Sequence, residues 1–510
     1  MERIVSGWSD GYVTDIDYTH GFYRELTPSL LAFCLLLKGI RPPSLSSFSY
    51  CELGFGQGFS TNLIAAANPG GDFWATDFNP SHAAGAKQLA MSAGTGNVKF
   101  FDKSFAEFRD IETPEFDLIV LHGIYSWISP ENRATIIEMI RRKLKPGGVV
   151  YISYNCLPGW SAAMPLRQLI VEHGATTRES RVRQVQQGIA FADRLVETKA
   201  GYFAQNPGAA ARLDLMKKLP AAYLVHEYLN RDWTPKYFAE VARELDDAKL
   251  SFAASANPAD HVDLVNLTPD AQKLLAEIHD VLLRETVRDY LLNQQFRKDI
   301  FVKGMVRLPV PEQTERLLKT RFALTAPRAS VPLEATFALG NVKLHAETYG
   351  PVLDALANGP ATLEQLLAMD GVRTIRLPSL VQAVTVLTAM GQVEPCLPEV
   401  GEADRAAGTR AFNTAVMNEA RSSDQLKFLA SPVTGGGISV NRFHRLFLLA
   451  MRGGADPAEF TWQALDRQNE RLTRDGTVLE SPDDNIAELR ARAEVFQAQW
   501  LPLYRQLGVA

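Results

Sequence analysis

The sequence contains few of the residues that build metal sites or disulfide frameworks. Its 510 residues include only four cysteines, none of them in a C-x-x-C pair. The nine histidines are scattered and form no H-E-x-x-H motif. We therefore expect no structural zinc site and no other bound metal. Because the cysteines lie among apolar residues, the sequence favours buried thiols in a reducing compartment.

An excess of positive charge is also absent. The chain has 53 basic and 58 acidic residues and a net charge of −5. This composition excludes bulk electrostatic binding to nucleic acid or anionic lipid. The N-terminus lacks the cationic start and apolar run of a signal peptide, and the apolar stretch at residues 30–40 is too short to span a bilayer. We expect a cytoplasmic protein without membrane insertion.

What the sequence does contain is a regular alternation of strand and helix patterns. The length suggests about two to four domains, and 46% hydrophobic with 22% charged residues is ordinary for a globular protein. The expected strands lie at residues 47–55, 71–79, 97–101, 116–124, 148–155, 249–257 and 300–308. Alternation at this spacing predicts an α/β domain with a parallel sheet.

The pattern divides the chain into three expected domains. Residues 1–310 form the α/β domain, with a helical insertion at about 160–240. The segment LPVPEQTERL, beginning at Leu308, is interpreted as a linker or domain border. Residues 311–400 then predict a winged-helix-like domain, and residues 401–510 a helix-rich C-terminal domain.

The winged-helix-like segment does not have the character of a nucleic-acid reader. Its second helix is expected to turn Gln382, Thr385 and Thr388 outward, without a stripe of Lys or Arg. Gripping phosphates requires such a stripe. We therefore expect no nucleic-acid partner.

Residues 50–60, YCELGFGQGFS, place three glycines between an expected strand and an expected helix. Gly54, Gly56 and Gly58 lack Cβ atoms, so the backbone there can turn tightly and approach a ligand. In open parallel sheets, ligands bind outside the carboxyl ends of the strands. The context of strand, turn and helix strengthens a motif that is weak alone.

Two kinds of ligand are possible at this loop, a dinucleotide or a cationic nucleoside. A dinucleotide site uses G-x-G-x-x-G, whereas here Phe59 stands where the last glycine should fall. The Glu52 carboxylate suits a cationic ligand such as S-adenosylmethionine (SAM), which has a sulfonium, an ammonium and no phosphate. Asp77 ends the second strand and can accept hydrogen bonds from both ribose hydroxyls. A nicotinamide cofactor would use the same carboxylate, and Asp77 can alternatively cap the helix entered through Pro80.

The segment after the third strand, FDKSFAEF, would lie beside the adenine of SAM. Many sites of this kind place an acid there to accept the exocyclic amine. Ser104 stands in the matching position and Asp102 is the nearest carboxylate, so either can serve. Phe105 can add an apolar wall and its backbone N–H. Asp102 can equally be a solvated turn residue.

Several longer segments together resemble one known family. These segments are ELGFGQGFSTNL, ATDFNPSHA, LHGIYSWIS, LKPGGVVYISYNCLPGW, HEYLN and RDYLLNQQFRKDIFVKG. They resemble bacterial class I SAM-dependent methyltransferases with a methyltransferase regulatory domain, whose best-known members are rickettsial protein-lysine methyltransferases that modify outer-membrane proteins. The resemblance covers most of residues 10–310. It implies a Rossmann-like seven-stranded sheet, a regulatory region at 215–305 and SAM as methyl donor.

The resemblance also implies site residues. It assigns cofactor contacts to Glu52, Gly54, Gly56, Gly58, Asp77, Ser104, Phe105 and His122. The serine at position 104 departs from the acid of the general class pattern. His122 ends the fourth strand, where methyltransferases line the methyl-transfer cleft, and Trp127 follows in the same matched segment.

The acceptor side of the site draws on three further segments. Tyr154 and Asn155 end the fifth strand, on the same sheet edge as the glycines, and are the catalytic candidates. The HEY segment lies in the helical insertion, which we expect to cover the cleft. The candidate substrate contacts are Tyr18, Tyr23, Trp127, His226, Glu227 and Tyr228. Tyr154 and Asn155 can instead satisfy backbone groups, and His226 and Glu227 can be a packing pair.

These observations predict methyl transfer from SAM to a protein acceptor, such as lysine side chains. A small metabolite or a glycan is the alternative acceptor, and a non-enzymatic SAM-binding scaffold is a third hypothesis. About 200 C-terminal residues favour a large acceptor, because a small molecule needs no docking module. The sequence does not define the oligomeric state.

Overall fold

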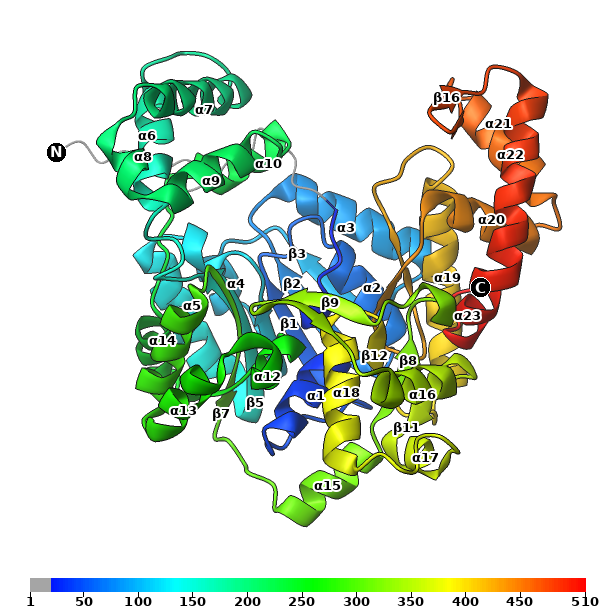
Figure 1. The fold of residues 1–510 in the computed structure, drawn as a ribbon, viewed down its shortest axis with the longest axis horizontal. Coiled ribbons are helices and arrows are strands. Elements are labelled where there is room, and N and C mark those ends of the chain that lie inside the picture. The colour runs from blue at the N-terminus through cyan, green and yellow to red at the C-terminus, as the bar shows by residue number, and fades with distance from the viewer. Residues whose placement is uncertain (1–19) are drawn as a thin grey trace.

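The computed structural model describes residues 20–510, and a seven-stranded sheet forms its centre (Figure 1). The strands are β1 (Phe48–Leu53), β2 (Gly71–Thr76), β3 (Val98–Phe101), β4 (Phe116–Leu121), β5 (Leu144–Asn155), β6 (Leu250–Ser255) and β7 (Phe296–Lys303). Their order is β3-β2-β1-β4-β5-β7-β6. β7 is antiparallel to both of its neighbours, and the other pairs are parallel. This confirms the Rossmann-like sheet expected from the sequence.

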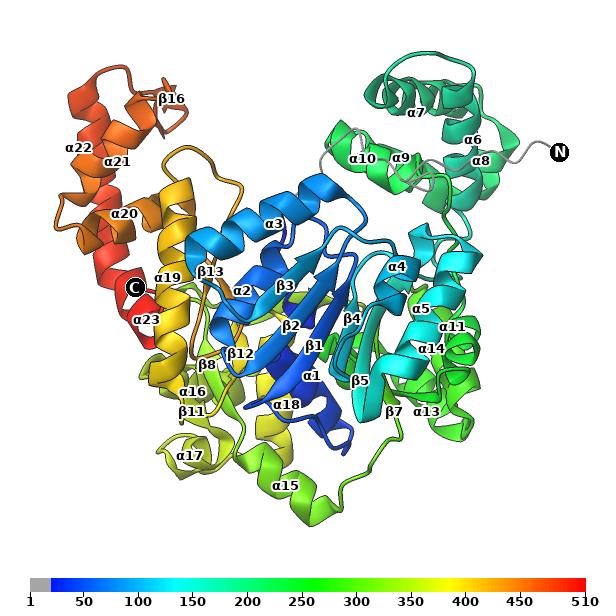
Figure 2. The ribbon, with the colours of Figure 1, turned by 180° about the vertical axis from the view of Figure 1, so that it is seen from behind.

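Helices cover both faces of this sheet (Figure 2). They are α1 (Pro28–Leu37), α2 (Phe59–Ala67), α3 (Pro80–Ala93), α4 (Phe105–Asp110), α5 (Pro130–Lys143), α11 (Phe238–Asp246) and α14 (Val281–Leu292). β4 shows why its sequence is almost continuously apolar. Leu118 and Val120 join the core on the α1 and α2 side, while Ile119 and Leu121 join the core on the α5 and α11 side.

The helical insertion between β5 and β6 has a small core of its own. Its helices are α6 (Met164–Ala175), α7 (Arg181–Glu197), α8 (Gly201–Gln205), α9 (Pro207–Met216) and α10 (Ala221–Tyr228). They bury one another around residues such as Leu166, Ile189 and Leu213. In Figures 1 and 2 this group stands beyond the end of the sheet where α4 and α5 begin.

After β7 the chain forms a smaller mixed layer beside the sheet. The short helices α12 (Asp263–Asn266) and α13 (Pro269–Glu277) lie between β6 and β7 in the chain and are not part of this layer. The layer contains α15 (Val310–Leu318), β8 (Arg321–Leu324), the hairpin of β9 (Glu334–Phe337) and β10 (Gly340–Lys343), α16 (Ala346–Ala357), β11 (Ala361–Thr362), α17 (Leu363–Ala368), α18 (Leu377–Ala389) and β12 (Val393–Cys396). β8, β11 and β12 form an antiparallel sheet beside α16, α17 and α18, an arrangement of the winged-helix-like type.

Two expectations for this part of the chain were wrong. The segment LPVPEQTERL is not an irregular linker, since it contains helix α15, and its role as a domain border stays a prediction. A proline is tolerated in the first helical turn, where its missing N–H is not needed. Thr385 and Thr388 do not face outward but are buried in α18. Their hydroxyls donate to the carbonyls of Val381 and Val384, each at 2.7 Å. This back-bonding lets a threonine sit in a core-facing helix position.

The C-terminal helices pack back onto the first part of the chain. They are α19 (Glu402–Glu419), α20 (Arg442–Arg452), α21 (Pro457–Asp466), α22 (Pro482–Val495) and α23 (Leu501–Gln506). Two small hairpins connect them. One pairs β13 (Phe428–Ala430) and β14 (Gly437–Ser439), and the other pairs β15 (Thr473–Arg474) and β16 (Thr477–Val478). α19 lies against α2 and α3. Arg24 forms a 2.7 Å ion pair with Glu394, and Asn68 donates a 2.8 Å hydrogen bond to the Gly435 carbonyl. Among residues 20–510, none of the helices combines the length and apolar character needed to cross a bilayer.

Candidate active site

A cavity of about 840 Å³ lies at the carboxyl ends of the central strands. The loops that follow β1, β2, β3, β4 and β5 line it, and so do Gly21, Tyr23 and residues of α9 and α10. This volume is typical of small-molecule and cofactor sites. The insertion therefore covers the sheet edge, as the sequence predicted.

The glycine loop needs its glycines. Gly54, Gly56 and Gly58 have φ angles of +74°, +56° and +67°, in the left-handed region. A Cβ on Gly54 would lie 2.8 Å from Cγ2 of Ile124, and one on Gly58 would lie 2.6 Å from Cβ of Ala86. The loop can therefore turn into α2 while its backbone remains open to the cavity.

Glu52 presents a buried carboxyl to the same cavity. The Thr61 hydroxyl donates a hydrogen bond to its Oε2. Burial raises the pKa of Glu52 to about 7, the hydrogen bond from Thr61 works in the opposite direction, and the negative charge of Asp77 adds to the rise. A cation placed beside Glu52 would favour its ionised form.

Asp77 is held by three donors from two neighbouring segments. Its Oδ2 accepts from the Gly56 N–H at 2.9 Å, and its Oδ1 accepts from the Asn79 N–H at 3.0 Å. Nδ1 of His82 lies 3.2 Å from the same Oδ1. The side chain that caps α3 is Asn79, which accepts from the Ser81 N–H. Asp77 is thus not the helix cap, and it lines the cavity.

Ser104 and Phe105 line the cavity at the beginning of α4. Ser104 is the N-cap of that helix. Its hydroxyl accepts from the Glu107 N–H, while its own N–H donates to the Glu107 carboxylate at 2.8 Å. Asp102 is exposed and does not line the cavity.

His122 is enclosed by aromatic rings at the end of β4. The ring of Tyr23 stacks on it with centroids 4.0 Å apart, and Nδ1 of His122 lies 2.8 Å from the Tyr151 hydroxyl. Burial lowers the pKa of His122 to about 4, although Glu25 partly opposes this change. The imidazole is therefore neutral at physiological pH.

The two residues that end β5 have different surroundings, because successive side chains of a strand point to opposite faces. Asn155 lines the cavity, and its buried Nδ2 has no hydrogen-bond partner among the described residues. Tyr154 is fully buried away from the cavity. Its hydroxyl donates a 2.7 Å hydrogen bond to Oδ2 of Asp299. The structure therefore brings only Asn155 into the candidate site.

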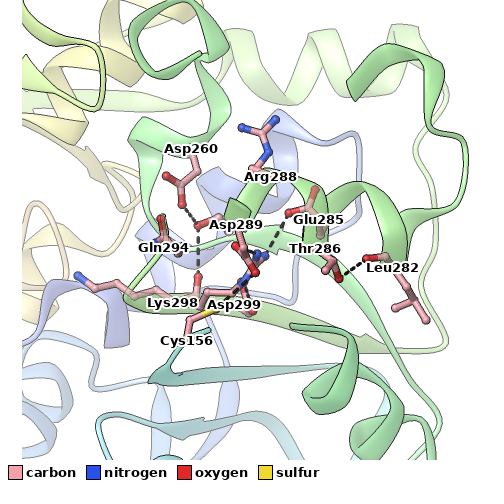
Figure 3. Close-up of polar contacts among 12 residues, drawn as sticks. Cys156, Asp260, Leu282, Glu285, Thr286, Arg288, Asp289, Gln294, Lys298 and Asp299 are labelled. Atoms are coloured by element: carbon pink, nitrogen blue, oxygen red, sulfur yellow. Dashed lines mark hydrogen bonds and ion pairs between the residues drawn. The ribbon is translucent and has the colours of Figure 1, made fainter. Parts of the chain in front are cut away.

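Tyr154 belongs instead to a buried charge cluster centred on Arg297. Figure 3 shows the acidic members of this cluster converging on β7. Arg297 pairs with Asp289 at 2.6 Å, with Asp299 at 2.8 Å and with Glu285 at 3.1 Å. Burial raises the pKa of Asp289 to about 7, an effect that Arg297 opposes. Sequence analysis missed this cluster, and its one signal was the pattern of charged residues inside an otherwise apolar strand.

Some of the candidate substrate residues line the cavity and others do not. Those that line the cavity are Tyr23, Trp127, His226 and Glu227. Tyr228 is buried away from it and accepts a 2.7 Å hydrogen bond from Nε of Arg212. Tyr18 lies outside the described residues. Lining residues that sequence analysis did not single out include His82, Asn132, Trp160, Arg212, Tyr223, Asn230 and Phe296.

Glu227 is an acidic group of the cavity roof, and Asp232, which also lines the cavity, pairs with Arg231 at 2.9 Å. Glu227 is partly buried, and within residues 20–510 no hydrogen bond or ion pair joins its carboxylate. Burial raises the pKa of Glu227, and the Arg212 guanidinium opposes this rise. Such a carboxylate is available to a ligand.

Comparisons with known proteins give a consistent result. A methyltransferase-domain model matches residues 51–148, and a predicted methyltransferase regulatory domain matches residues 220–303. The chain is 45% identical to the uncharacterized protein sll1526 of Synechocystis, over 99% of this chain and 100% of that protein. An uncharacterized protein of Rickettsia prowazekii is 27% identical over 58% of this chain and 53% of its own length.

The whole chain also resembles a solved structure, that of PKMT2 from Rickettsia typhi in complex with AdoHcy. The TM-score is 0.72 at 19% identity, over 97% of this chain and 100% of the other. The methyltransferase-domain match contains the glycine loop, Asp77 and His122, and the sheet has the strand order described above. SAM is the methyl donor that this domain implies. The chain therefore belongs to the class I SAM-dependent methyltransferases that carry a methyltransferase regulatory domain.

Proposed function

We propose that this enzyme binds SAM across the glycine loop and methylates a protein, with the amine of a lysine side chain as acceptor. In this arrangement Glu52 faces the cationic amino-acid end of SAM and Asp77 faces the ribose. Phe105 and the start of α4 face the adenine. Glu52 and Asp77 are both buried carboxylates, whose charge suits a sulfonium nucleoside and repels a phosphate.

The chemistry makes modest demands on the protein. SAM supplies an electrophilic methyl group on sulfur, and transfer to an amine leaves a methylated ammonium and S-adenosylhomocysteine. Because the leaving group is already good, the residues of the chain mainly align the acceptor. His122 contributes a neutral wall, which places no positive charge beside the sulfonium. Asn155 presents its amide to the cavity, where its Oδ1 can accept an N–H of the acceptor amine.

The observation that carries the lysine proposal is the carboxylate of Glu227 in the roof. A lysine arrives as an ammonium and must lose a proton before its nitrogen can attack. Glu227 can bind the ammonium and accept that proton at a carboxylate oxygen. Its raised pKa makes it a stronger base than an exposed carboxylate. Tyr23, Trp127 and Tyr223 give the cavity the aromatic walls that suit a cation.

Two further observations support a protein as acceptor. The sequence segments resemble rickettsial protein-lysine methyltransferases, and the likeness to PKMT2 extends over the C-terminal parts of the chain as well as the sheet. Of those parts, α19 packs onto α2 and α3, so the C-terminal helices are placed to hold a large acceptor near the sheet.

The test compares host cells with and without this gene. Lysates of the deletion strain are incubated with purified protein and isotope-labelled SAM, and protein, glycan and metabolite fractions are separated. We expect label in protein, with mass spectrometry assigning it to methyllysine. Label that enters only metabolites or glycans overturns the protein acceptor but leaves the methyltransferase assignment intact.

A further inference from the structure

The carboxylate of Asp77 has little acceptor capacity left. An ionised carboxylate offers about four lone-pair positions, two on each oxygen. Oδ1 already accepts from the Asn79 N–H and stands 3.2 Å from Nδ1 of His82, and Oδ2 accepts from the Gly56 N–H. Only one position remains, on Oδ2. A ribose presents two hydroxyl donors, so the second needs another acceptor.

His82 has that acceptor, in a defined tautomer. The Asp77 carboxylate can only accept, so the hydrogen bond between them requires the proton to be on Nδ1 of His82. In the neutral ring, Nε2 is then a bare acceptor. His82 lines the cavity with only 7% of its surface exposed, and its buried Nε2 has no hydrogen-bond partner among residues 20–510. A buried acceptor without a donor is costly unless a ligand supplies one.

The local sequence fixes this placement. Asn79 caps α3 and Pro80 occupies its first turn, so the helix begins immediately beyond the end of β2. His82 consequently lies within the first turn, and its ring reaches back to Asp77. The two side chains form one unit at the cavity wall.

We propose that Asp77 and His82 share the ribose diol of the cofactor, with one hydroxyl donating to Oδ2 of Asp77 and the other to Nε2 of His82. This inference rests on the proposed position of SAM over the glycine loop. It makes His82 a direct cofactor contact that selects for a nucleoside with both hydroxyls. It also gives the imidazole a second role, because its Nδ1–H orients the carboxylate.

The experiment measures binding of S-adenosylhomocysteine and of its 2′-deoxy and 3′-deoxy analogues by calorimetry. In the wild-type protein each missing hydroxyl is expected to weaken binding about tenfold, the effect of one hydrogen bond. His82→Asn keeps a donor near the position of Nδ1 but lacks the Nε2 acceptor. In this variant, removal of one of the two ribose hydroxyls should weaken binding only about twofold or less, whereas removal of the other should still weaken it about tenfold.

Several results would overturn the proposal. They are a wild-type protein that binds both deoxy analogues as tightly as the parent compound, or a His82→Asn variant that retains both penalties or loses both together. Asp77→Asn tests the underlying cofactor position separately. If this variant binds S-adenosylhomocysteine as tightly as the wild-type protein does, SAM does not bind beside Asp77 and His82.

A measurement on the wild-type protein covers the case in which the variant does not fold. Nitrogen NMR reports which ring nitrogen carries the proton. Addition of S-adenosylhomocysteine should shift the Nε2 resonance of His82, and one deoxy analogue should leave it unshifted. Equal shifts with all three ligands contradict the shared diol.

Discussion

The backbone N–H of Gly56 donates a hydrogen bond of 2.9 Å to Oδ2 of Asp77. This bond joins the glycine loop after β1 to the end of β2, so that two separate segments that line the cavity are held in one geometry. Preorganisation of this kind lowers the cost of binding. It also means that a change at Asp77 disturbs the glycine loop.

The first prediction concerns that carboxylate. Asp77→Asn should weaken binding of S-adenosylhomocysteine about 100-fold, because it removes a charge-assisted acceptor and alters the contact with Gly56. Calorimetry measures the affinity. Asp72→Asn is the matched control, since Asp72 lies at the other end of β2, is half-buried there and pairs with Lys99. Equal affinities for the Asp77 variant and this control would remove Asp77 from the site.

The second prediction is a pH dependence of cofactor binding. Burial raises the pKa of Glu52 to about 7 from an ordinary 4.5. The ammonium of a bound S-adenosylhomocysteine favours the ionised carboxylate, so binding should release a proton and weaken as the pH falls through about 7. Calorimetry from pH 6 to pH 8 in buffers of different ionisation enthalpy measures this proton release. Glu52→Gln should abolish the dependence.

The same shift affects stability with a definite sign. The folded, ligand-free protein holds the Glu52 proton between pH 4.5 and about 7, whereas the unfolded chain does not. Ionisation of Glu52 therefore reduces the free energy of unfolding as the pH rises through this window, by up to roughly 3 kcal/mol. Glu52→Gln should make the protein more stable than wild type at pH 8 but not at pH 4. Urea titrations at the two pH values provide the comparison.

The third prediction contrasts two neighbouring residues. Tyr154→Phe should lower the free energy of unfolding by about 1–3 kcal/mol, because it removes a buried hydrogen bond to the Asp299 carboxylate. It should leave cofactor affinity and turnover within about twofold of wild type. Asn155→Ala should instead reduce turnover at least tenfold with little change in stability, since its amide faces the cavity. Reversed effects would show that the acceptor approaches from the Tyr154 side.

The fourth prediction addresses the acceptor. Glu227→Gln should lower kcat/KM for the protein acceptor by about 10–100-fold, the usual range for a lost proton acceptor, and leave affinity for S-adenosylhomocysteine unchanged. Glu197→Gln, an exposed carboxylate at the end of α7 in the same insertion, is the control. Steady-state kinetics with the protein substrate would separate the two variants. Indistinguishable kinetics would argue against a proton acceptor in the roof.

Much of the fold was predictable from local pattern. The strands of the sheet are short apolar runs between turn residues, and the glycine spacing marks where β1 ends. The boundaries of α15 were not predictable in this way, because Pro309 and Pro311 resemble a linker until the chain is seen to use Pro311 in a first helical turn. The packing of Thr385 and Thr388 depends on their tertiary surroundings, which no helix pattern reports.

Residues that line the cavity were predictable where an ionisable side chain stands at the end of a strand. Glu52, Asp77 and His122 end or nearly end their strands, and all three line the cavity. Strand pleating alone would have separated Tyr154 from Asn155, but the choice between them required knowing which face the cavity occupies. The sequence did not point to His82, because its contact with Asp77 arises from a helix turn that brings the ring back to the end of β2.

The hydrogen bonds and the ion pair between the N-terminal and C-terminal parts of the chain affect its folding during synthesis. Ser29 donates a hydrogen bond to the Thr434 carbonyl, and Arg24 and Asn68 also bind partners about 370 residues further on. A ribosome therefore releases the first strands long before their contacts exist, and a nascent chain that ends near β7 leaves apolar faces of α1 and α2 uncovered. Chaperone demand should peak at that length, and a fragment cut there would aggregate rather than serve as a minimal enzyme.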